Sequence, residues 1–456
     1  MARHRRNDQL AALIEESGWS AAQLARAVNA LGKAQSLTLR YDRTSVAHWL
    51  TGSRPRSPVP HLVSQALSQR LGRLVSPEDA GLSVHPPTRS AVTDDDALTP
   101  VRRLAAVART EADTSLRGRV LAIPYSLAPL TAVAESREDP GVTDPPAHRG
   151  THVTSFNLHA LDDMTEGFSH MFNAYGGAHG RTALAAYLAD DATTLLTAVA
   201  SSPSLHRSLL TATARLTHLL ALMTADAGHQ GLAQEYFRTS LSLSRQSDHA
   251  TAQAITLRAM STQAWRLGHI RYAHQLAEAA VTIAKSASEL SPAEGTFLHA
   301  QYALTLALTH QPGAARAALA KAEDAHPEVA TSSGLFTSYS RAGLDYQRAQ
   351  TLLVLGETAP AVTALRESLR RRHPTHHRQY ALTQARLAEI LLRTGDLEAA
   401  CDHWNLFLDH HLRLNSAPVR TAFQQILLLL PRHRAHRQAE ETWRRALSYV
   451  RRDSAR

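Results

Sequence analysis

The chain has 456 residues, too many for one hydrophobic core, so we expect two to four domains or an extended repeat array. Alanine and leucine dominate and aromatic residues are only 5%, a composition that favours helix packed on helix and leaves little room for sheet. The net charge is +9, and residues 1–90 hold 12 Lys and Arg against 6 Asp and Glu, so the basic excess is concentrated near the start.

Cysteine usage and hydropathy bear on the compartment. Cys401 is the one cysteine, so it cannot form an internal disulfide or a multi-cysteine zinc site, and we expect it to be a buried small hydrophobe. The basic residues of Met1 to Arg6 are not followed by an apolar core with a cleavage site. No apolar run approaches the roughly 18 residues that span a bilayer. We therefore expect a cytoplasmic protein with no membrane partner.

Four short helices are predicted in the N-terminal domain, which we place at residues 1–83. The first ends at Gly18 and the second at Gly32, because glycine allows the left-handed conformation that stops a helix. Asp42 is a good N-terminal cap for a short third helix, Arg43 to Leu50. A fourth helix is predicted from about residue 60 to residue 72.

The third helix directs Val46, Trp49 and Leu50 inward, so its other side chains face out. An arginine there can donate two hydrogen bonds to guanine, a threonine methyl can touch thymine, and histidine or serine can make single bonds. Flanking arginines can reach phosphates. An ordinary exposed surface helix is the alternative. The residues expected to bind DNA are Arg40, Arg43, Thr44, Ser45, His48, Arg54 and Arg56.

These residues resemble the phage-repressor-like (XRE/Cro-type) helix-turn-helix family over residues 7–82. The resemblance rests on Gln23-Leu24-Ala25, on Ser45-Val46 to Trp49-x-x-Gly52, and on Pro55 before the fourth helix. It implies a domain that binds double-stranded DNA. The turn between the second and third helices, Gly32 to Asp42, is several residues longer than is usual in that family.

A closer resemblance concerns the whole chain and not only this domain. Tyr41 through Leu50, followed by Gly52 and Arg54-Pro55-Arg56, is similar to a group of actinomycete regulators that join such a domain to helical repeats. Lysine accounts for only 3 of the 49 basic residues, which is consistent with a GC-rich genome of that kind. The resemblance implies control of development or secondary metabolism.

Residues 84–150 are predicted to connect the domain to the rest of the chain. Val84 to Pro100 is rich in Pro, Thr, Asp and Ser and indicates a flexible linker, and Val101 to Thr114 has a helical pattern. Residues 119–133 fit either a strand or an apolar tether. Glu135 to Gly150 is again rich in Pro, Gly and charge.

Residues 151–456 repeat one pattern: a helix, a short turn, then an alanine with a usually larger residue four positions later. Successive alanines are 40, 42, 46 and 39 residues apart, and in four copies a glycine precedes the alanine by five residues. A left-handed turn at that glycine would let the second helix fold back on the first. The pairs are Ala233–Phe237, Ala273–Ala277, Ala315–Leu319, Ala361–Leu365 and Ala400–Trp404, with Ala439–Trp443 as a sixth copy; the glycines are Gly228, Gly268, Gly356 and Gly395.

This pattern resembles the tetratricopeptide repeat, in which a small alanine permits close helix approach, although the usual period is 34 residues. A HEAT-like array has a nearer spacing but lacks the glycine-to-alanine turn. The fold class expected is therefore all-α, with an N-terminal helix-turn-helix domain followed by a tetratricopeptide-like α-solenoid.

A solenoid of this kind offers a concave groove, lined by the first helix of each pair, for a peptide or protein partner. The same architecture resembles the peptide-sensing quorum regulators of Gram-positive bacteria. An ordinary surface position is the alternative for each groove candidate. The candidates are Arg258, Gln263, His299, Gln301, Tyr346, Gln350, Gln384 and Arg386.

No catalytic, metal or cofactor site is indicated. His373, His376 and His377 flank Pro374, which interrupts any helix that would hold two metal ligands on one face. The glycines at 176–180 lack the Lys-Ser/Thr of a phosphate loop and indicate a break between helices. We expect a sequence-specific transcriptional regulator, a repressor, that forms a homodimer through its repeats. A protein-interaction adaptor without DNA-binding activity and an unrecognised enzyme are the alternatives.

Overall fold

The computed structural model describes residues 7–34, 37–56, 58–71, 75, 80–82, 99–127, 152–287, 290–327, 339–373 and 375–453. Over these ranges the chain is nearly all helix, and the one extended pairing described joins β1 (His152–Val153) to β2 (Val199–Ala200) in parallel. The expected all-α fold with a repeated helical region is thus confirmed. The chain forms two compact units: Met1–His159, Thr182–Asp248 and Gln263–Gln275 make unit 1, and Ala160–Arg181, His249–Thr262 and Leu276–Arg456 make unit 2.

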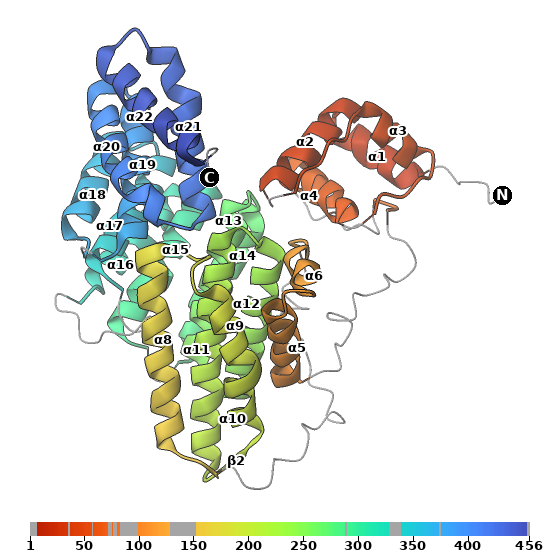
Figure 1. Cartoon of the computed structure of the whole chain (residues 1–456), viewed down its shortest axis with the longest axis vertical. Helices are drawn as coiled ribbons and strands as arrows, with labels where there is room; N and C mark the ends of the chain where they lie inside the picture. Colours follow the sequence, from red (N-terminus) through yellow and green to blue (C-terminus); the bar gives the residue numbers. More distant parts are fainter. Residues whose placement is uncertain are drawn as a thin grey trace. The chain divides into compact units, whose positions relative to one another are not determined.

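Four helices of unit 1 form a small head (Figure 1). They are α1 (Asp8–Ser17), α2 (Ala21–Ala34), α3 (Arg43–Leu50) and α4 (Val59–Leu71). Each contributes one apolar stripe to a shared core, in which Leu10, Leu24, Val46 and Leu62 are fully buried. The side-chain amide of Asn7 donates to the carbonyls of Ala80 and Gly81, at 2.9 and 3.1 Å, so the head is closed by its last described residues.

Gly32 does not end α2, contrary to the prediction. It is buried inside the helix, and a Cβ added there would collide with the side chain of Leu39. The connection after α2 folds back onto the helix here, so a side chain at this position would force the side chain of Leu39 to move. Gly18, by contrast, caps α1 in the left-handed conformation with a φ of 65°, as predicted.

The rest of unit 1 begins with the connecting region. The helix predicted from Val101 is present as α5 (Pro100–Ala112), followed by α6 (Arg117–Leu121). Residues 122–127 then lie against α12 without forming a strand. The predicted linker at 84–98, the remainder of the possible strand at 128–133 and the segment 135–150 lie outside the described residues. Before the repeats come α9 (Arg181–Tyr187), the π-helical turn η1 (Leu188–Ala192) and α10 (Thr193–Thr197).

Helical hairpins recur through the remainder of the chain, as Figure 1 shows for the helices from α15 onward. They are preceded by α8 (Ser155–Tyr175), which ends at the predicted glycine break. The helices of the hairpins are α11 (Pro203–Ala227), α12 (Gln230–Gln246), α13 (Ala250–Arg266), α14 (Ile270–Ala284), α15 (Pro292–Leu308), α16 (Pro312–Asp324), α17 (Arg341–Val354), α18 (Thr358–Arg371), α19 (His377–Arg393), α20 (Leu397–His410), the 3₁₀ turn η2 (His411–Arg413), α21 (Ala417–Leu429), the 3₁₀ turn η3 (Leu430–His433) and α22 (Arg437–Asp453).

The alanine anchors and their turns confirm the repeat pattern. All five anchors are fully buried, and so is Ala439 of the sixth copy. The four glycines that precede them have φ between 83° and 106°, which is the left-handed conformation predicted. In the third copy the equivalent position, five residues before Ala315, is His310, and it too has a positive φ, of 61°. The turn is therefore a property of the position and not only of glycine.

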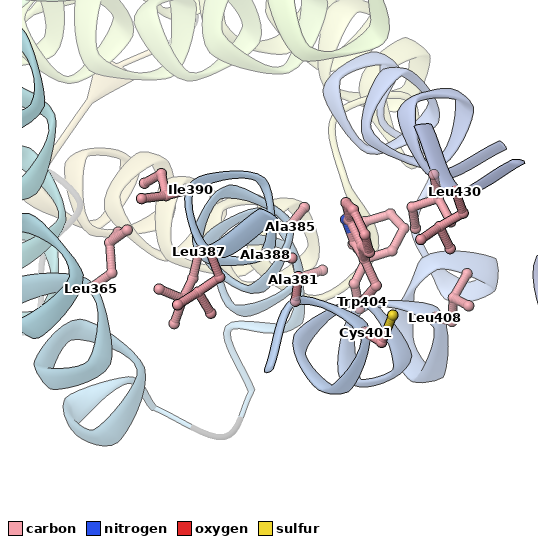
Figure 2. Packing of buried hydrophobic residues seen from close by; sticks show 14 of the residues in the cluster. Leu365, Ala381, Ala385, Leu387, Ala388, Ile390, Cys401, Trp404, Leu408 and Leu430 are labelled. Atoms are coloured by element: carbon pink, nitrogen blue, oxygen red, sulfur yellow. The ribbon is translucent and has the colours of Figure 1, made fainter. Parts of the chain in front are cut away.

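One cluster of buried apolar residues lies in unit 2. Figure 2 shows Trp404 and Cys401 of α20 beside Ala381 and Ala385 of α19, so the indole fills space that two alanines leave open. Cys401 is fully buried, in agreement with the packing role expected for it, and burial raises the pKa of its thiol.

Substitutions at the turns should separate backbone strain from packing. A Cβ added at Gly395 would have no neighbour within 4 Å, so the cost of Gly395→Ala comes from φ alone and should be roughly 1–2 kcal/mol. His310→Gly should instead stabilise the protein by roughly 0.5 kcal/mol, because relief of strain exceeds the added entropy of the unfolded chain. Urea unfolding of the two variants measures both. If Gly395→Ala leaves the free energy of unfolding unchanged, the turn tolerates a side chain at this position.

Candidate nucleic-acid interface

The N-terminus of α3 is held by a capping box. The carboxylate of Asp42 accepts hydrogen bonds from the backbone N–H and the hydroxyl of Ser45, both at 2.9 Å, and the Ser45 hydroxyl accepts from the backbone N–H of Asp42 at 3.4 Å. The bond from the Ser45 N–H is the largest cause that lowers the pKa of Asp42. The predicted boundaries of this helix, Arg43 to Leu50, are confirmed.

The inner face of α3 packs on the head core. Val46 is fully buried and Trp49 is 4% exposed, while Leu50 is half-buried. The ring of Tyr41, just before the helix, meets the Trp49 indole edge to face, with centroids 5.2 Å apart. These contacts fix the rotation of the helix about its own axis, and hence which side chains face outward.

Asn29 of α2 holds the long connection to α3 in place. Its side-chain nitrogen donates to the carbonyl of Tyr41 at 2.7 Å, and its side-chain oxygen accepts from the backbone N–H of Tyr41 at 2.9 Å. At the other end of the connection, the N–H of Leu37 donates to the carbonyl of Gly32 at 2.8 Å. The extra length therefore does not leave α3 loosely attached to α2. Sequence reasoning missed Asn29, because nothing in the sequence shows which backbone a helical asparagine will meet.

The structure places the predicted DNA-binding residues on α3 and on the segments immediately before and after it. Arg43 and Ala47, and likewise Thr44 and His48, are one helical turn apart, so each pair lies on one outward side of the helix. Ser45 is half-buried and its hydroxyl is engaged in the cap, which makes it the least available of the predicted contacts. The exposed residues are Arg40, Arg43, Thr44, His48, Arg54 and Arg56.

The predicted groove residues give a different result, because several of them are buried between helices. Gln263 is 6% exposed and donates to the carbonyl and the side-chain oxygen of Gln230, at 2.8 and 3.0 Å. Gln384 is 2% exposed and its side-chain oxygen lies 2.6 Å from a ring nitrogen of His403. Gln350 is 4% exposed. The prediction that these three line a groove is wrong, because all three side chains are buried. The sequence was misleading because a buried polar residue has the same helical spacing as a polar residue on a surface.

A related row of hydrogen bonds joins residues of unit 2 on three first helices, α13, α15 and α17. The side-chain nitrogen of Gln347 on α17 donates to the side-chain oxygen of Gln301 on α15, and Gln301 donates to the hydroxyl of Ser261 on α13, both at 3.0 Å. Gln301 is fully buried, so it joins neighbouring first helices and is not a groove residue either. Satisfied buried amides of this kind fix the register of one helix on the next.

The remaining groove candidates are half-buried. The guanidinium of Arg258 on α13 lies over the ring of Phe297 on α15, 3.7 Å from its centroid. Arg386 is paired with Glu389 on its own helix at 3.1 Å, and burial lowers the pKa of His299. Tyr346 packs against the apolar cluster of unit 2. None of these contacts forms a recognisable ligand site.

The chain's own α8 covers one end of a first helix. The guanidinium of Arg378 on α19 lies 4.7 Å from the ring centroid of Phe172, and Gln379 hydrogen-bonds Asn173. The backbone of Asn415 donates to the carbonyl of Tyr175 at 2.7 Å and accepts from the N–H of Ala178 at 3.0 Å. The C-terminal end of α8 thus packs against the first turn of α19 and the segment before α21 within unit 2.

Metal sites and membrane-spanning helices are both absent from the described ranges. No group of three or more His, Cys, Asp or Glu residues there is arranged to hold a metal ion. No helix in those ranges is both long and apolar enough to cross a membrane. The rings of His373 and His376 are tilted toward each other at 5.5 Å, whereas Pro374 lies outside the described residues.

Comparison with known proteins gives one finding for the head. Residues 10–83 match a family model described as the SP15 N-terminal domain. The match begins within α1 and ends one residue after the buried Leu82, so it coincides with the folded head. The chain is similar to that family over this domain alone. No curated protein matches the chain.

Removing the Asn29 side chain should loosen α3 without changing its outward face. Asn29→Ala leaves the N–H and the carbonyl of Tyr41 without their partners, and we expect the opening of α3 to become easier by about 1–2 kcal/mol. Native-state hydrogen exchange of the amides of residues 43–50 measures this. Asn29→Asp keeps one of the two hydrogen bonds, so the protection of its α3 amides should fall between that of the parent and that of Asn29→Ala. Unchanged protection of α3 in Asn29→Ala would contradict the role given to this residue.

Proposed function

We propose that the head is a helix-turn-helix domain that binds double-stranded DNA with sequence preference, and that the protein is a transcriptional regulator. The observation that carries the proposal is the outward side of α3, where Arg43, Thr44 and His48 are exposed on a helix fixed at its cap and along its inner face. Within α3 no acidic residue opposes the approach of phosphates.

Each exposed residue has a definite use in this proposal. The guanidinium of Arg43 presents two parallel donors that match O6 and N7 of guanine in the major groove, and Thr44 and His48 offer one contact each. Arg40 before the helix, and Arg54 and Arg56 after it, are exposed and would pair with phosphates on either side of the groove. Base contacts would then confer preference, and the arginines would supply most of the salt-dependent affinity.

A single head would be a weak binder. The eight residues of α3 span only about 12 Å, enough to contact a few base pairs. We therefore propose that the protein binds as a homodimer formed by its repeat region, with two heads in successive major grooves. The half-sites would lie about 10 base pairs apart, or a multiple of that distance, and the operator would be a pseudo-palindrome.

The test starts from a random pool of duplexes, from which the full-length protein selects the sequences that it binds. The variants are then compared on a selected sequence. Arg43→Ala should cost roughly 1–3 kcal/mol on the selected sequence and relax the preference at one base pair. Arg54→Ala should weaken all sequences alike and reduce the slope of log affinity against log salt by about 1 for each head that binds. Fluorescence anisotropy with labelled duplexes at several salt concentrations measures both effects.

The matched control removes the same charge elsewhere. Arg393 is exposed at the end of α19, and Arg393→Ala should bind the selected duplex as the parent protein does. If Arg43→Ala keeps parental affinity and sequence preference, α3 is not the reading helix. If the parent protein selects no sequence at all, the adaptor function without DNA binding becomes the better explanation.

A further inference from the structure

The segment after α6 is fastened to α12 at two points, both within unit 1. The backbone N–H of Ser126 donates to the side-chain oxygen of Gln234 at 2.9 Å, and the side-chain nitrogen of Gln234 donates to the carbonyl of Ser126 at 2.6 Å. Three residues earlier, the carbonyl of Ile123 lies so close to Gly231 that any Cβ there would collide with it. Residues 122–127 are thus seated on α12, and we call them the strap.

The strap presents one aromatic ring to the turn of the next hairpin. Tyr125 is 3% exposed and stacks on the imidazole of His269, with an interplanar angle of 10° and centroids 5.6 Å apart. His269 follows the left-handed Gly268, and its backbone forms the turn by bonds to Ala264 and Ala273, both at 2.9 Å. The imidazole takes no part in those bonds, so the turn can form without it.

The other edge of the same imidazole meets the head. The side-chain nitrogen of Gln65, on α4, lies 2.9 Å from Nε2 of His269. Burial lowers the pKa of His269 to about 4, so at neutral pH the ring is uncharged and Nε2 can accept the amide hydrogen. Gln65 is itself only 4% exposed, although its neighbours Val63 and Ala66 belong to the head core. It is a polar residue of the head whose side chain contacts the repeats.

We propose that Gln65, His269 and Tyr125 form a latch that sets the orientation of the head on the α13–α14 turn, and that this latch determines which half-site spacing the protein accepts. The inference rests on the proposed function and adds specificity-determining residues to it. The latch uses α4, whereas Arg43, Thr44 and His48 on α3 are exposed in the same structure. A latched head can therefore read a half-site.

The physical effect of a latch is on geometry and not on base contacts. A head on a loose tether samples many positions, so two of them can engage half-sites over a broad range of spacings, each with modest effective concentration. A head held at a fixed orientation favours the half-site spacing that matches it. The protein then loses affinity when one half-site is rotated about the duplex axis relative to the other. Spacing preference is thus the property that distinguishes a latched head from a tethered one.

The test uses the full-length protein and the selected duplex, with the distance between half-sites increased one base pair at a time over a helical turn. The parent should lose roughly tenfold or more in affinity when the half-sites move by half a turn. Gln65→Ala and His269→Ala should flatten this profile to within about threefold, whereas Tyr125→Phe, which keeps the stacked ring, should match the parent. On a duplex with a single half-site all four proteins should bind alike.

A second measurement needs no DNA. Hydrogen exchange should become faster in α4 in both alanine variants and in the strap in His269→Ala, which loses the stacked ring, and remain unchanged in α17 to α20. Gln65→Ala leaves the repeats intact and His269→Ala leaves the head intact, so agreement between them excludes misfolding of either part as the cause. The latch is overturned if both alanine variants show the same spacing preference as the parent. It is also overturned if hydrogen exchange in α4 and in the strap stays at the parental rate. If the parent protein selects no duplex, the proposed function is overturned, and the role in half-site spacing with it. Hydrogen exchange then still reports whether the contact between Gln65 and His269 holds the head.

Discussion

The repeat region depends on the close approach of two helices at a residue with almost no side chain. In the hairpin α11–α12 the hydroxyl of Ser240, seven residues after the anchor Ala233, donates to the carbonyl of Ala214 at 2.8 Å. In α17–α18 the equivalent bond joins Ser368 to the carbonyl of Ala342 at 2.6 Å. A short hydroxyl can reach the backbone of a neighbouring helix only where the two backbones are this close. The alanine sets the separation, and the left-handed turn before it sets the direction of return.

The parts proposed to act together are arranged around one of these turns. His269 directly follows the left-handed Gly268, and the strap that covers its ring is seated against Gly231, where no side chain fits. A glycine with positive φ and a glycine in close contact thus have different uses within unit 1. The first bends the chain, and the second allows another backbone to lie against a helix.

Local signals in the sequence predicted most of the fold and much of the exposed face of α3. Asp42 and Ser45 predict a helix start because the capping bonds are made within three residues, and the repeated glycines predict turns for the same local reason. Gly32 was misread because its role depends on Leu39, which packs on it from the following connection. The buried glutamines were misread because burial depends on neighbouring hairpins, about 40 residues away along the chain. The contact of Gln65 with His269 joins residues 204 positions apart, and no local pattern contains it.

Cys401 has a practical consequence. It is the one thiol in the sequence, it is fully buried, and burial raises its pKa, so little reactive thiolate reaches solvent at neutral pH. A cysteine introduced on an exposed position of the head or of the repeats would react with a maleimide dye or a spin label well before the native thiol. The protein can thus be labelled at chosen positions without first replacing a residue that fills its core, and the orientation of the head can be measured by spectroscopy in an otherwise unaltered chain.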